Sequence, residues 1–534
     1  MLPSRMQDLV NLRHLDTKGT YYLKEMPKGM SKLKHLNLLG HFAVGEHEEN
    51  GIRELGPIDV HGSFHISKLE NVNSSSEALE AKMGNKKHIN KLKLVWSCSD
   101  GDTVDVHAER DILKELRPHE NLKKLSIYGY RDEIFPDWLG LPCYSNITKL
   151  RMYGCKNCRE LPSLGQLPSL QHLEIFELHR LVRISEEFYK SVESCHDGTW
   201  TPFRSLEYLK FYGMKGWRVW HIPDKLDVFP KLKTLTLWNC PVLSGDLAAR
   251  LPALERLNIW ECEELSYSLL RAPKLHLFNV KGLGNSALLT AAPHDIRIVD
   301  SQQGQSVLEW LLHIQPPCFQ RLIIQNCRSE ISISGDYLPA SLQYLEISRC
   351  SKLIFPEPLE HKLLKEIDVY KCDSLTLFPV GALPNLKTLT IRYCPEIDCF
   401  GEECLPPSLT TLEIYECQKL ERWITSNGGL QSEGLTHLTL SRWNEVKSFP
   451  REGCLPASLH SLKLSCFPNL ERLDCKGLHH LTSLKELSIV DCPKLENITE
   501  ERLPASISKL YIEGECPLTS KLQEMNDPRF RMKN

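Results

Sequence analysis

The stretch LPNLKTLTIRYC, residues 383–394, recurs along this chain with small changes. LPASLQYLEISRC precedes it at 338–350, and LPPSLTTLEIYEC and LPASLHSLKLSC follow at 405–417 and 455–466. Each copy contains the frame L-x-x-L-x-L, in which the last two apolar anchors alternate with polar residues. Such alternation is typical of a short β-strand with one buried face. The chain is therefore predicted to contribute one short strand per copy.

The frame recurs at a nearly constant period. With Leu, Ile, Phe or Val allowed at each anchor, the first anchors are Leu122, Ile147, Leu170, Leu206, Leu232, Leu254, Leu275, Phe319, Leu342, Leu364, Leu386, Leu409, Leu435, Leu459, Leu484 and Ile507. Most steps are between 21 and 26 residues long, which is the period of leucine-rich repeats. A longer step of 36 residues holds the polar insertion 191–200, and one of 44 residues holds a degenerate strand at 294–300 and a short helix at 306–314.

The period predicts an α/β solenoid of the leucine-rich-repeat horseshoe type. One repeat cannot bury its leucines alone, so neighbours stack and share a core, with parallel strands on the concave face. The Leu-Pro pairs between frames favour mostly irregular convex turns, because Pro blocks helix continuation. Residues 1–121 fit more loosely, with frames at Leu12, Leu33, Leu55 and Ile89 and convex helices within 74–89 and 106–119. Residues 122–534 are predicted to continue the same solenoid as regular repeats.

A cysteine recurs eight residues after the first anchor. It is found in nine repeats, at Cys155, Cys240, Cys262, Cys327, Cys350, Cys372, Cys394, Cys417 and Cys492. There the chain leaves its strand, and a small side chain can point into the core as a buried thiol. We expect free core thiols rather than disulfides or a metal site. The pair in CKNC at 155–158 has no second pair to complete four zinc ligands.

The sequence contains no recognisable catalytic or cofactor motif. It has no phosphate loop of the G-x-x-x-x-G-K-[ST] type, no H-E-x-x-H and no G-x-S-x-G. The CHD triplet at 195–197 lies in the polar insertion, and the His pair at 479–480 is predicted to lie in a solvated loop. We therefore expect no enzyme activity and no catalytic, cofactor-binding or metal-binding residue in this chain.

Charge and hydropathy limit the partners and the cellular compartment that are expected for this chain. The net charge of −3 over 534 residues offers no bulk attraction for nucleic acid. The start shows no signal peptide, and nowhere do 18 apolar residues follow one another, so no membrane insertion is expected. The chain is predicted to be cytoplasmic, with the nucleus as the other option.

One position of the frame collects aromatic residues. The position six residues after the first anchor should face the concave side, together with those at two and four. It holds Tyr128, Tyr153, Phe176, Tyr212, Trp238 and Trp260 in six consecutive repeats, and Tyr370 and Tyr415 resume the column later. Aromatic residues favour strands and stack on one another, and they also anchor protein partners. Both readings remain open from the sequence.

Charged residues at the second and fourth positions change sign along the chain. The early repeats have Lys124, Lys149, Arg151, Lys210 and Arg256, whereas later ones have Glu346, Glu366, Asp368, Glu413 and Glu486. Solvated surface explains such charges equally well. If they act in recognition, Lys149, Arg151 and Lys210 join the aromatic column in a partner-binding face, and the change of sign orients the partner.

Several stretches resemble a known family. NLRHLDTKGTYYLKEMPKGMSKLKHLNLLGHFAVGE at 11–46, then GSFHISKLENV at 62–72, LRPHENLKKLSIYGY at 116–130 and CRELPSLGQLPSLQHLEI at 158–175 resemble the leucine-rich-repeat region of plant intracellular disease-resistance receptors. These are the coiled-coil nucleotide-binding leucine-rich-repeat (NLR) proteins. The resemblance covers essentially the whole chain, and 62–175 is its most specific part. That family has a coiled coil and an ADP/ATP-binding switch domain before its repeats, so a nucleotide cofactor is expected only there and not in this chain.

The resemblance implies a division of labour. In such receptors the repeats hold the switch domain in its inactive state and help to sense a pathogen effector or a guarded host protein, which starts defence signalling and local cell death. The expected partners are therefore the receptor's own or a cognate switch domain, and an effector or guarded protein. A stand-alone repeat adaptor or ubiquitin-ligase substrate receptor is the alternative. An extracellular ectodomain is disfavoured because the chain lacks L-x-G-x-I-P repeats.

Overall fold

The structure is a computed structural model in which two compact units are distinguished. It describes residues 2–3, 5–17, 20, 23–97, 106–190, 201–223, 227–246, 251–262, 264–266, 274–278, 295–299, 305, 308–309, 318–400, 405–426, 430, 432–498, 503–524 and 530–532. The first unit holds the described residues of Met1–Pro273, and the second holds those of Lys274–Asn279 and Ala291–Asn534. Each unit is described by itself.

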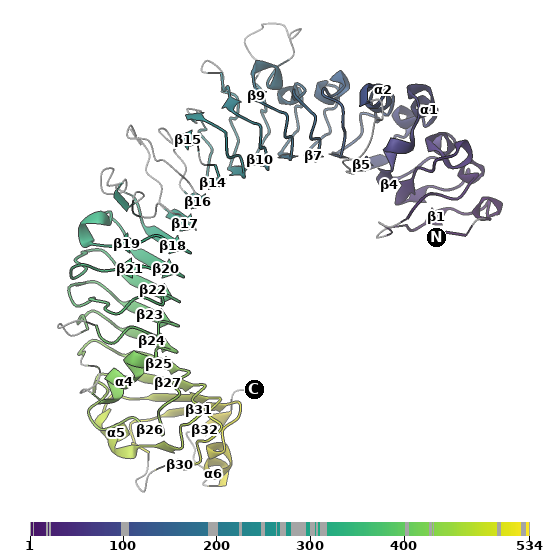
Figure 1. Ribbon diagram of the computed structural model, residues 1–534. Helices are drawn as coiled ribbons and strands as arrows, with labels where there is room; N and C mark the ends of the chain where they lie inside the picture. The colour runs from purple at the N-terminus through teal and green to yellow at the C-terminus, as the bar shows by residue number, and fades with distance from the viewer. Residues whose placement is uncertain are drawn as a thin grey trace. The chain divides into compact units, whose positions relative to one another are not determined.

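The first unit is built on one parallel sheet whose strands pair in chain order (Figure 1). Its strands are β3 (His41–Ala43), β4 (Gly62–Ser67), β5 (Ile89–Val95), β6 (Lys124–Tyr128), β7 (Lys149–Tyr153), β8 (His172–Phe176), β10 (Tyr208–Tyr212), β12 (Thr234–Trp238) and β14 (Arg256–Trp260). Helices α1 (Ser75–Glu80) and α2 (Val106–Glu115) lie on the side of the unit away from these strands. Both fall inside the two segments that were predicted to be helical.

The second unit repeats the same parallel arrangement. Its strands are β16 (Lys274–Phe278), β17 (Asp295–Val299), β18 (Arg321–Gln325), β20 (Tyr344–Ser348), β22 (Glu366–Tyr370), β23 (Thr388–Arg392), β24 (Thr411–Tyr415), β25 (His437–Ser441), β27 (Ser461–Ser465), β29 (Glu486–Val490), β31 (Lys509–Glu513) and β32 (Phe530–Met532). Its helices are α4 (Gln418–Ser426), α5 (Cys475–His480) and α6 (Leu518–Glu524). The predicted degenerate strand at 294–300 is β17.

The predicted alternation is present within the strands. In β23, Leu389 and Ile391 are buried, whereas Thr388, Thr390 and Arg392 remain partly exposed. The same pattern recurs in β6, β7, β10 and β24. Each buried Leu or Ile contributes roughly 1.5–3 kcal/mol, so stacking of repeats supplies the core. The prediction of a leucine-rich-repeat α/β solenoid is confirmed.

In most of the described repeats, the residue after the main-sheet strand, seven positions beyond the first anchor, turns the chain away from the sheet with a positive φ. Non-glycine residues adopt this conformation at Glu177, Asn239, Glu261, Asn326, Arg349, Lys371, Tyr393, Glu416, Arg442, Cys466 and Asp491, and glycines do so at Gly129, Gly154, Gly213 and Gly514. Its N–H donates to the carbonyl that ends the neighbouring strand. Two examples are Asn239 N to Trp260 O and Arg349 N to Tyr370 O, both at 2.7 Å. This bond compensates for a backbone conformation that is unfavourable for most residues.

The recurring cysteines are buried, as predicted, and among the described residues no cysteine forms a disulfide bond. Their thiols donate to the carbonyl two residues earlier, for example Cys394 Sγ to Arg392 O at 3.4 Å and Cys417 Sγ to Tyr415 O at 3.4 Å. Burial raises the pKa of Cys417 to about 12. These thiols therefore act as small core residues with a weak hydrogen-bond donor.

Short elements fill the remainder of each repeat. Two-residue parallel strands form a second row in each unit, namely β1 (His14–Leu15), β2 (Leu38–Leu39), β9 (Arg183–Ile184), β11 (Val219–Trp220), β13 (Gly245–Asp246), β15 (Leu265–Ser266), β19 (Ile331–Ser332), β21 (Leu353–Ile354), β26 (Ser448–Phe449), β28 (Arg472–Leu473) and β30 (Asn497–Ile498). Single 3-10 turns are η1 (Met6–Asp8), η2 (Met30–Lys32), η3 (Glu48–Asn50), η4 (Ile52–Leu55), η5 (Leu69–Asn71), η6 (Met83–Asn85), η7 (Asp137–Gly140), η8 (Leu164–Gln166), η9 (Glu186–Phe188) and η10 (Gly335–Tyr337). Such turns agree with the expected irregular convex side.

Two early frames were placed wrongly. The frame at Leu33 makes Leu38 a core anchor, but Leu38 is 46% exposed, and the main-sheet strand of that repeat is β3 around buried Phe42. The frame at Leu55 predicts a strand near residues 57–60, but the strand is β4, in which Phe64 and Ile66 are buried. In that repeat the first anchor position is taken by a polar residue, so a search for apolar anchors selects an earlier run.

Other predictions fall partly or wholly beyond the described residues. The insertion 191–200, with its CHD triplet, lies outside them, and so does most of the predicted helix at 306–314. The His pair at 479–480 is exposed but ends helix α5 rather than lying in a loop. The boundary predicted at residue 121 stays a prediction.

Candidate partner-binding faces

The six early aromatic residues form one continuous ladder in the first unit. Each occupies the last position of its strand, and in-register parallel pairing sets each ring beside the next. Ring centroids are 5.5, 5.7, 5.8, 5.1 and 4.6 Å apart along Tyr128, Tyr153, Phe176, Tyr212, Trp238 and Trp260. All six side chains are partly exposed. The rings thus stabilise one another and still present an apolar edge to a partner.

Lysine side chains lie over this ladder, which we call the aromatic ladder below. Lys210 Nζ is 5.4 Å from the ring centroids of Phe176 and Trp238 and 5.8 Å from that of Tyr212. Lys93 Nζ is 4.4 Å from the ring of Tyr128, and burial lowers the pKa of Lys93. Cation–π contacts of this kind hold ammonium groups at an otherwise apolar surface.

Two of the predicted basic residues are already paired. Glu174 on β8 accepts from Lys149 Nζ at 2.6 Å and from Arg151 Nε at 2.8 Å. Burial opposes ionisation of Glu174, but its hydrogen bonds to Lys149 and Arg151 outweigh burial and lower its pKa. The sequence analysis missed Glu174, although it stands at the same repeat position as Arg151 and Lys210. Comparing every fourth-position residue between neighbouring frames would have revealed it.

Lys210 differs from that pair. Among the described residues, no carboxylate lies within ion-pair distance of Lys210, although Glu174 is its in-register neighbour on β8. Lys91, Lys124 and Arg256, each two residues after the first anchor of its repeat, extend the basic face and are exposed. The open face of the first unit therefore combines an aromatic edge with surplus positive charge.

The second unit carries an acidic row on the corresponding face. Glu346, Asp368, Thr390 and Glu413 are in-register neighbours on β20, β22, β23 and β24. Tyrosines donate to both glutamates, Tyr344 Oη to Glu346 Oε2 at 3.2 Å and Tyr415 Oη to Glu413 Oε2 at 3.1 Å.

Asp368 stands in the middle of this acidic row. Burial raises its pKa, and the nearby Arg392 opposes this rise. Its Oδ2 is paired with Arg392, whereas Oδ1 is buried and has no hydrogen-bond partner among the described residues.

Tyr370 and Tyr415 do not continue the aromatic ladder. They lie in the second unit, and Arg392 occupies the strand position between them. Tyr370 instead packs edge-to-face on Tyr393, at 5.5 Å between centroids. These two predicted residues therefore belong to the acidic face, which is separate from the ladder that carries the other nine.

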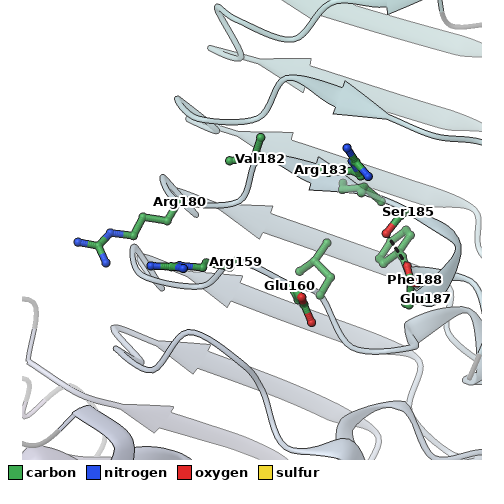
Figure 2. A pocket seen from close by; sticks show the side chains of 10 residues that line it. Arg159, Glu160, Arg180, Val182, Arg183, Ser185, Glu187 and Phe188 are labelled. Atoms are coloured by element: carbon green, nitrogen blue, oxygen red, sulfur yellow. Dashed lines mark hydrogen bonds between the residues drawn. The ribbon is translucent and has the colours of Figure 1, made fainter.

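A pocket of about 670 Å³ lies in the first unit beside the second row of short strands (Figure 2). Arg159, Arg180 and Arg183 contribute cations to its lining, and Glu160 and Glu187 contribute carboxylates. Arg159 also pairs with Glu133 outside the pocket, at 2.8 Å. The opposing charges leave the pocket with little preference for a ligand of either sign.

Comparison with known proteins gives these faces a context. The family described as R13L1/DRL21 leucine-rich repeats matches residues 52–178, which span β4 to β8 and the first half of the aromatic ladder. An RPP13-like disease-resistance protein of Arabidopsis thaliana is 31% identical over 369 residues, which cover 66% of this chain. The repeats are thus similar to those of plant disease-resistance proteins. The matched range encloses 62–175, the stretch that carried the resemblance most specifically.

Other plant disease-resistance proteins are also similar to this chain. A second disease-resistance protein of Arabidopsis thaliana is 24% identical over 94% of this chain, and the disease resistance protein RGA2 of Solanum bulbocastanum is 31% identical over 39% of it. The chain spans about a third of the RPP13-like relative, about half of the second Arabidopsis relative and about a fifth of RGA2.

One solved structure, the complex of TLR13 with ssRNA13, aligns with 93% of this chain, and the alignment covers 68% of the TLR13 chain. Its TM-score is 0.49 at 17% identity, which is too distant to bear on function. Among the residues described for our chain, none of the helices has the length and apolar character of a membrane span.

Proposed function

We propose that this chain is the non-catalytic recognition and autoinhibitory region of an intracellular plant immune receptor. Its similarity to plant disease-resistance proteins supports this assignment. The receptor would act in the cytoplasm or the nucleus. Its ADP or ATP would be held by a nucleotide-binding switch domain and not by the repeats.

The observation that carries the proposal is the basic and aromatic face of the first unit. A face that bound both states of a switch domain equally would shift no equilibrium, so it must bind the inactive state more tightly. Lys210 lies among three rings and has no carboxylate of the described residues within ion-pair distance, so it suits an acidic partner surface. We infer that this face holds the inactive switch domain.

The acidic row of the second unit suits the sensing role. The carboxylates of Glu346, Asp368 and Glu413 lie along one row of partly exposed side chains, and a guanidinium or ammonium group of a partner would pair with them. We infer that a pathogen effector or guarded host protein presents a basic segment to this row.

A charge-reversal experiment tests the autoinhibitory role. The triple variant Lys149→Glu, Arg151→Glu and Lys210→Glu, made in the whole receptor, should signal cell death without a pathogen. The introduced acids repel the switch domain and favour its active state. Spontaneous cell death in leaf tissue, scored at matched protein levels, is the measurement.

The matched control reverses Lys114, Arg204 and Lys231, three exposed cations of the first unit that lie outside the main sheet. The control receptor should stay silent until its effector is present. If the first variant is also silent while accumulating normally, the basic face does not restrain the receptor. If both signal, the effect is not specific to that face.

A further inference from the structure

Two histidines and an aspartate converge at the start of two neighbouring strands in the first unit. His61 directly precedes β4 and His88 directly precedes β5, and Gly62 pairs in register with Ile89. The two histidines therefore occupy adjacent positions at the start of neighbouring strands. Asp59 stands two residues before His61, which in extended backbone places both side chains on one face.

The ligand atoms of these residues are close together. Asp59 Oδ2 is 3.2 Å from His61 Nε2 and 3.8 Å from His88 Nε2. One ligand atom from each of the three residues lies within 4.8 Å of the others, and the imidazole centroids are 4.2 Å apart. In tetrahedral zinc sites with bonds of about 2.1 Å, ligand atoms are about 3.4 Å apart. The two distances from Asp59 Oδ2 already lie within about 0.4 Å of that spacing.

We propose that Asp59, His61 and His88 bind a divalent transition-metal ion, with zinc as the ion that best fits their chemistry. Two imidazoles and one carboxylate form a borderline donor set that suits Zn²⁺, Co²⁺ or Ni²⁺ better than Mg²⁺ or Ca²⁺. Water or a partner's side chain completes the coordination. The ion links the lead-in to β4 with the lead-in to β5.

The backbone around the cluster is held by contacts that do not involve the metal ligands' side chains. His61 N donates to Asn37 O at 2.7 Å, and Gly62 N donates to His88 O at 2.8 Å. Buried Lys86 ties the turn before Asp59 to the lead-in to β5, because its Nζ donates to Leu55 O at 2.7 Å and Ile58 O at 2.6 Å. The ligands therefore stand on ordered backbone, as a binding site requires.

The charge around the site and the exposure of its ligands determine the expected affinity for zinc. The three side chains are partly or fully exposed, and the ammonium of Lys86 acts electrostatically on Asp59. With three protein ligands, solvent access and a nearby cation, the site should bind zinc at micromolar concentrations. It should not be the tight, closed site of a structural zinc finger.

The alternative is a surface contact in which His61 donates to Asp59 and the rings pack together. The whole chain is titrated with Co²⁺ under reducing conditions and with exposed thiols blocked. This titration distinguishes a metal site from a surface contact without metal. The proposal expects a d–d absorption band without thiolate-to-cobalt charge transfer, and competition by Zn²⁺. Calorimetry with Zn²⁺ alone then supplies the stoichiometry and the dissociation constant.

The variants His88→Gln and Asp59→Asn should weaken that binding by about tenfold or more and lose the cobalt band. The control, His479→Gln combined with His480→Gln, alters an exposed pair on α5. It should leave the metal affinity and the cobalt band unchanged. Circular dichroism checks that each variant is folded, and hydrogen exchange at 59–66 and 86–92 should slow with Zn²⁺ only when all three ligands are present. Equal zinc binding by wild type and His88→Gln, or a band that survives in both variants, would overturn the proposal.

Discussion

Glu109 shows how a single buried charge joins neighbouring repeats of the first unit. It lies on α2 with 3% of its surface exposed, and it accepts from Arg131 Nε at 2.7 Å and Arg131 N at 2.8 Å. Burial raises its pKa, and these two hydrogen bonds oppose the rise. The carboxylate thereby satisfies both a guanidinium and a backbone N–H in the repeat that follows.

Replacing Glu109 with Gln should lower the free energy of unfolding by about 2–3 kcal/mol, because Arg131 then keeps a partly buried charge without its counter-ion. Urea denaturation followed by circular dichroism measures the loss. The control is Glu49→Gln, which breaks an exposed pair with Lys28 and should destabilise the protein less than Glu109→Gln does. Equal losses in the two variants would show that the burial of Glu109 adds nothing.

The left-handed residue after each strand shows the limit of residue-level prediction. Glycine and asparagine suit that conformation, but Lys371, Tyr393 and Glu416 adopt it too. These residue types do not predict a turn from the sequence. At these positions the N–H is held by the terminal carbonyl of the neighbouring strand, for example Lys371 N to Arg392 O at 2.8 Å, so contact with the next repeat supports the conformation.

At the scale of elements, β3 and β4 carry a pair of stacked histidines. His41 and His65 are in-register neighbours with ring centroids 4.4 Å apart. Burial lowers the pKa of His65 from 6.5 to about 3, and the charges of His41 and Lys93 add to this effect. Burial also lowers the pKa of His41.

This pair should make the chain sensitive to acid. Between pH 6.5 and about 3 the imidazole of His65 is protonated in the unfolded chain but not in the folded one. The unfolded state then binds more protons, so the free energy of unfolding falls as pH falls through this window. His65 should account for about 1–2 kcal/mol between pH 8 and pH 5, after allowance for partial solvent exposure.

Urea denaturation at pH 8, 6 and 5 measures that dependence. His65→Gln should flatten the fall in stability, whereas His479→Gln, at an exposed position, should leave the slope as in the wild type. The same slope in wild type and His65→Gln would contradict the assignment.

At the scale of the whole molecule, stability should be a sum over stacked repeats within each unit. The stretch Leu364–Asn385 is one period of 22 residues, and its removal leaves β20 followed by β23 in the same frame. Because each repeat contacts mainly its neighbours, this deletion should yield a folded, cooperative protein with a slightly smaller urea m-value. Circular dichroism and urea denaturation test it.

Deletion of Leu364–Ser374 is the control, because it removes half a period and breaks the register of the frames. That protein should be poorly folded or aggregated. If both deletions unfold the chain, stability depends on contacts beyond adjacent repeats.

Much of the fold could be predicted from local sequence. The spacing of Leu389 and Ile391 marks their strand, and the recurrence of Cys394 marks a buried position, because each repeat meets the same environment as the one before it. The aromatic ladder was also predictable, since residues at one frame position stack when strands pair in register. The early frames at Leu33 and Leu55 failed where polar residues replace the apolar anchors.

What the sequence by itself determined is therefore the repeat, its buried positions and the column of aromatic side chains. Tertiary structure decided which charges neutralise one another and which stay open. The pairing of Glu174 with Lys149 and Arg151, and the approach of His61 to His88, join residues more than twenty positions apart in the chain. Only the stacking of repeats brings such residues together, because the period sets their shared position while the side chains on adjacent strands set the contact.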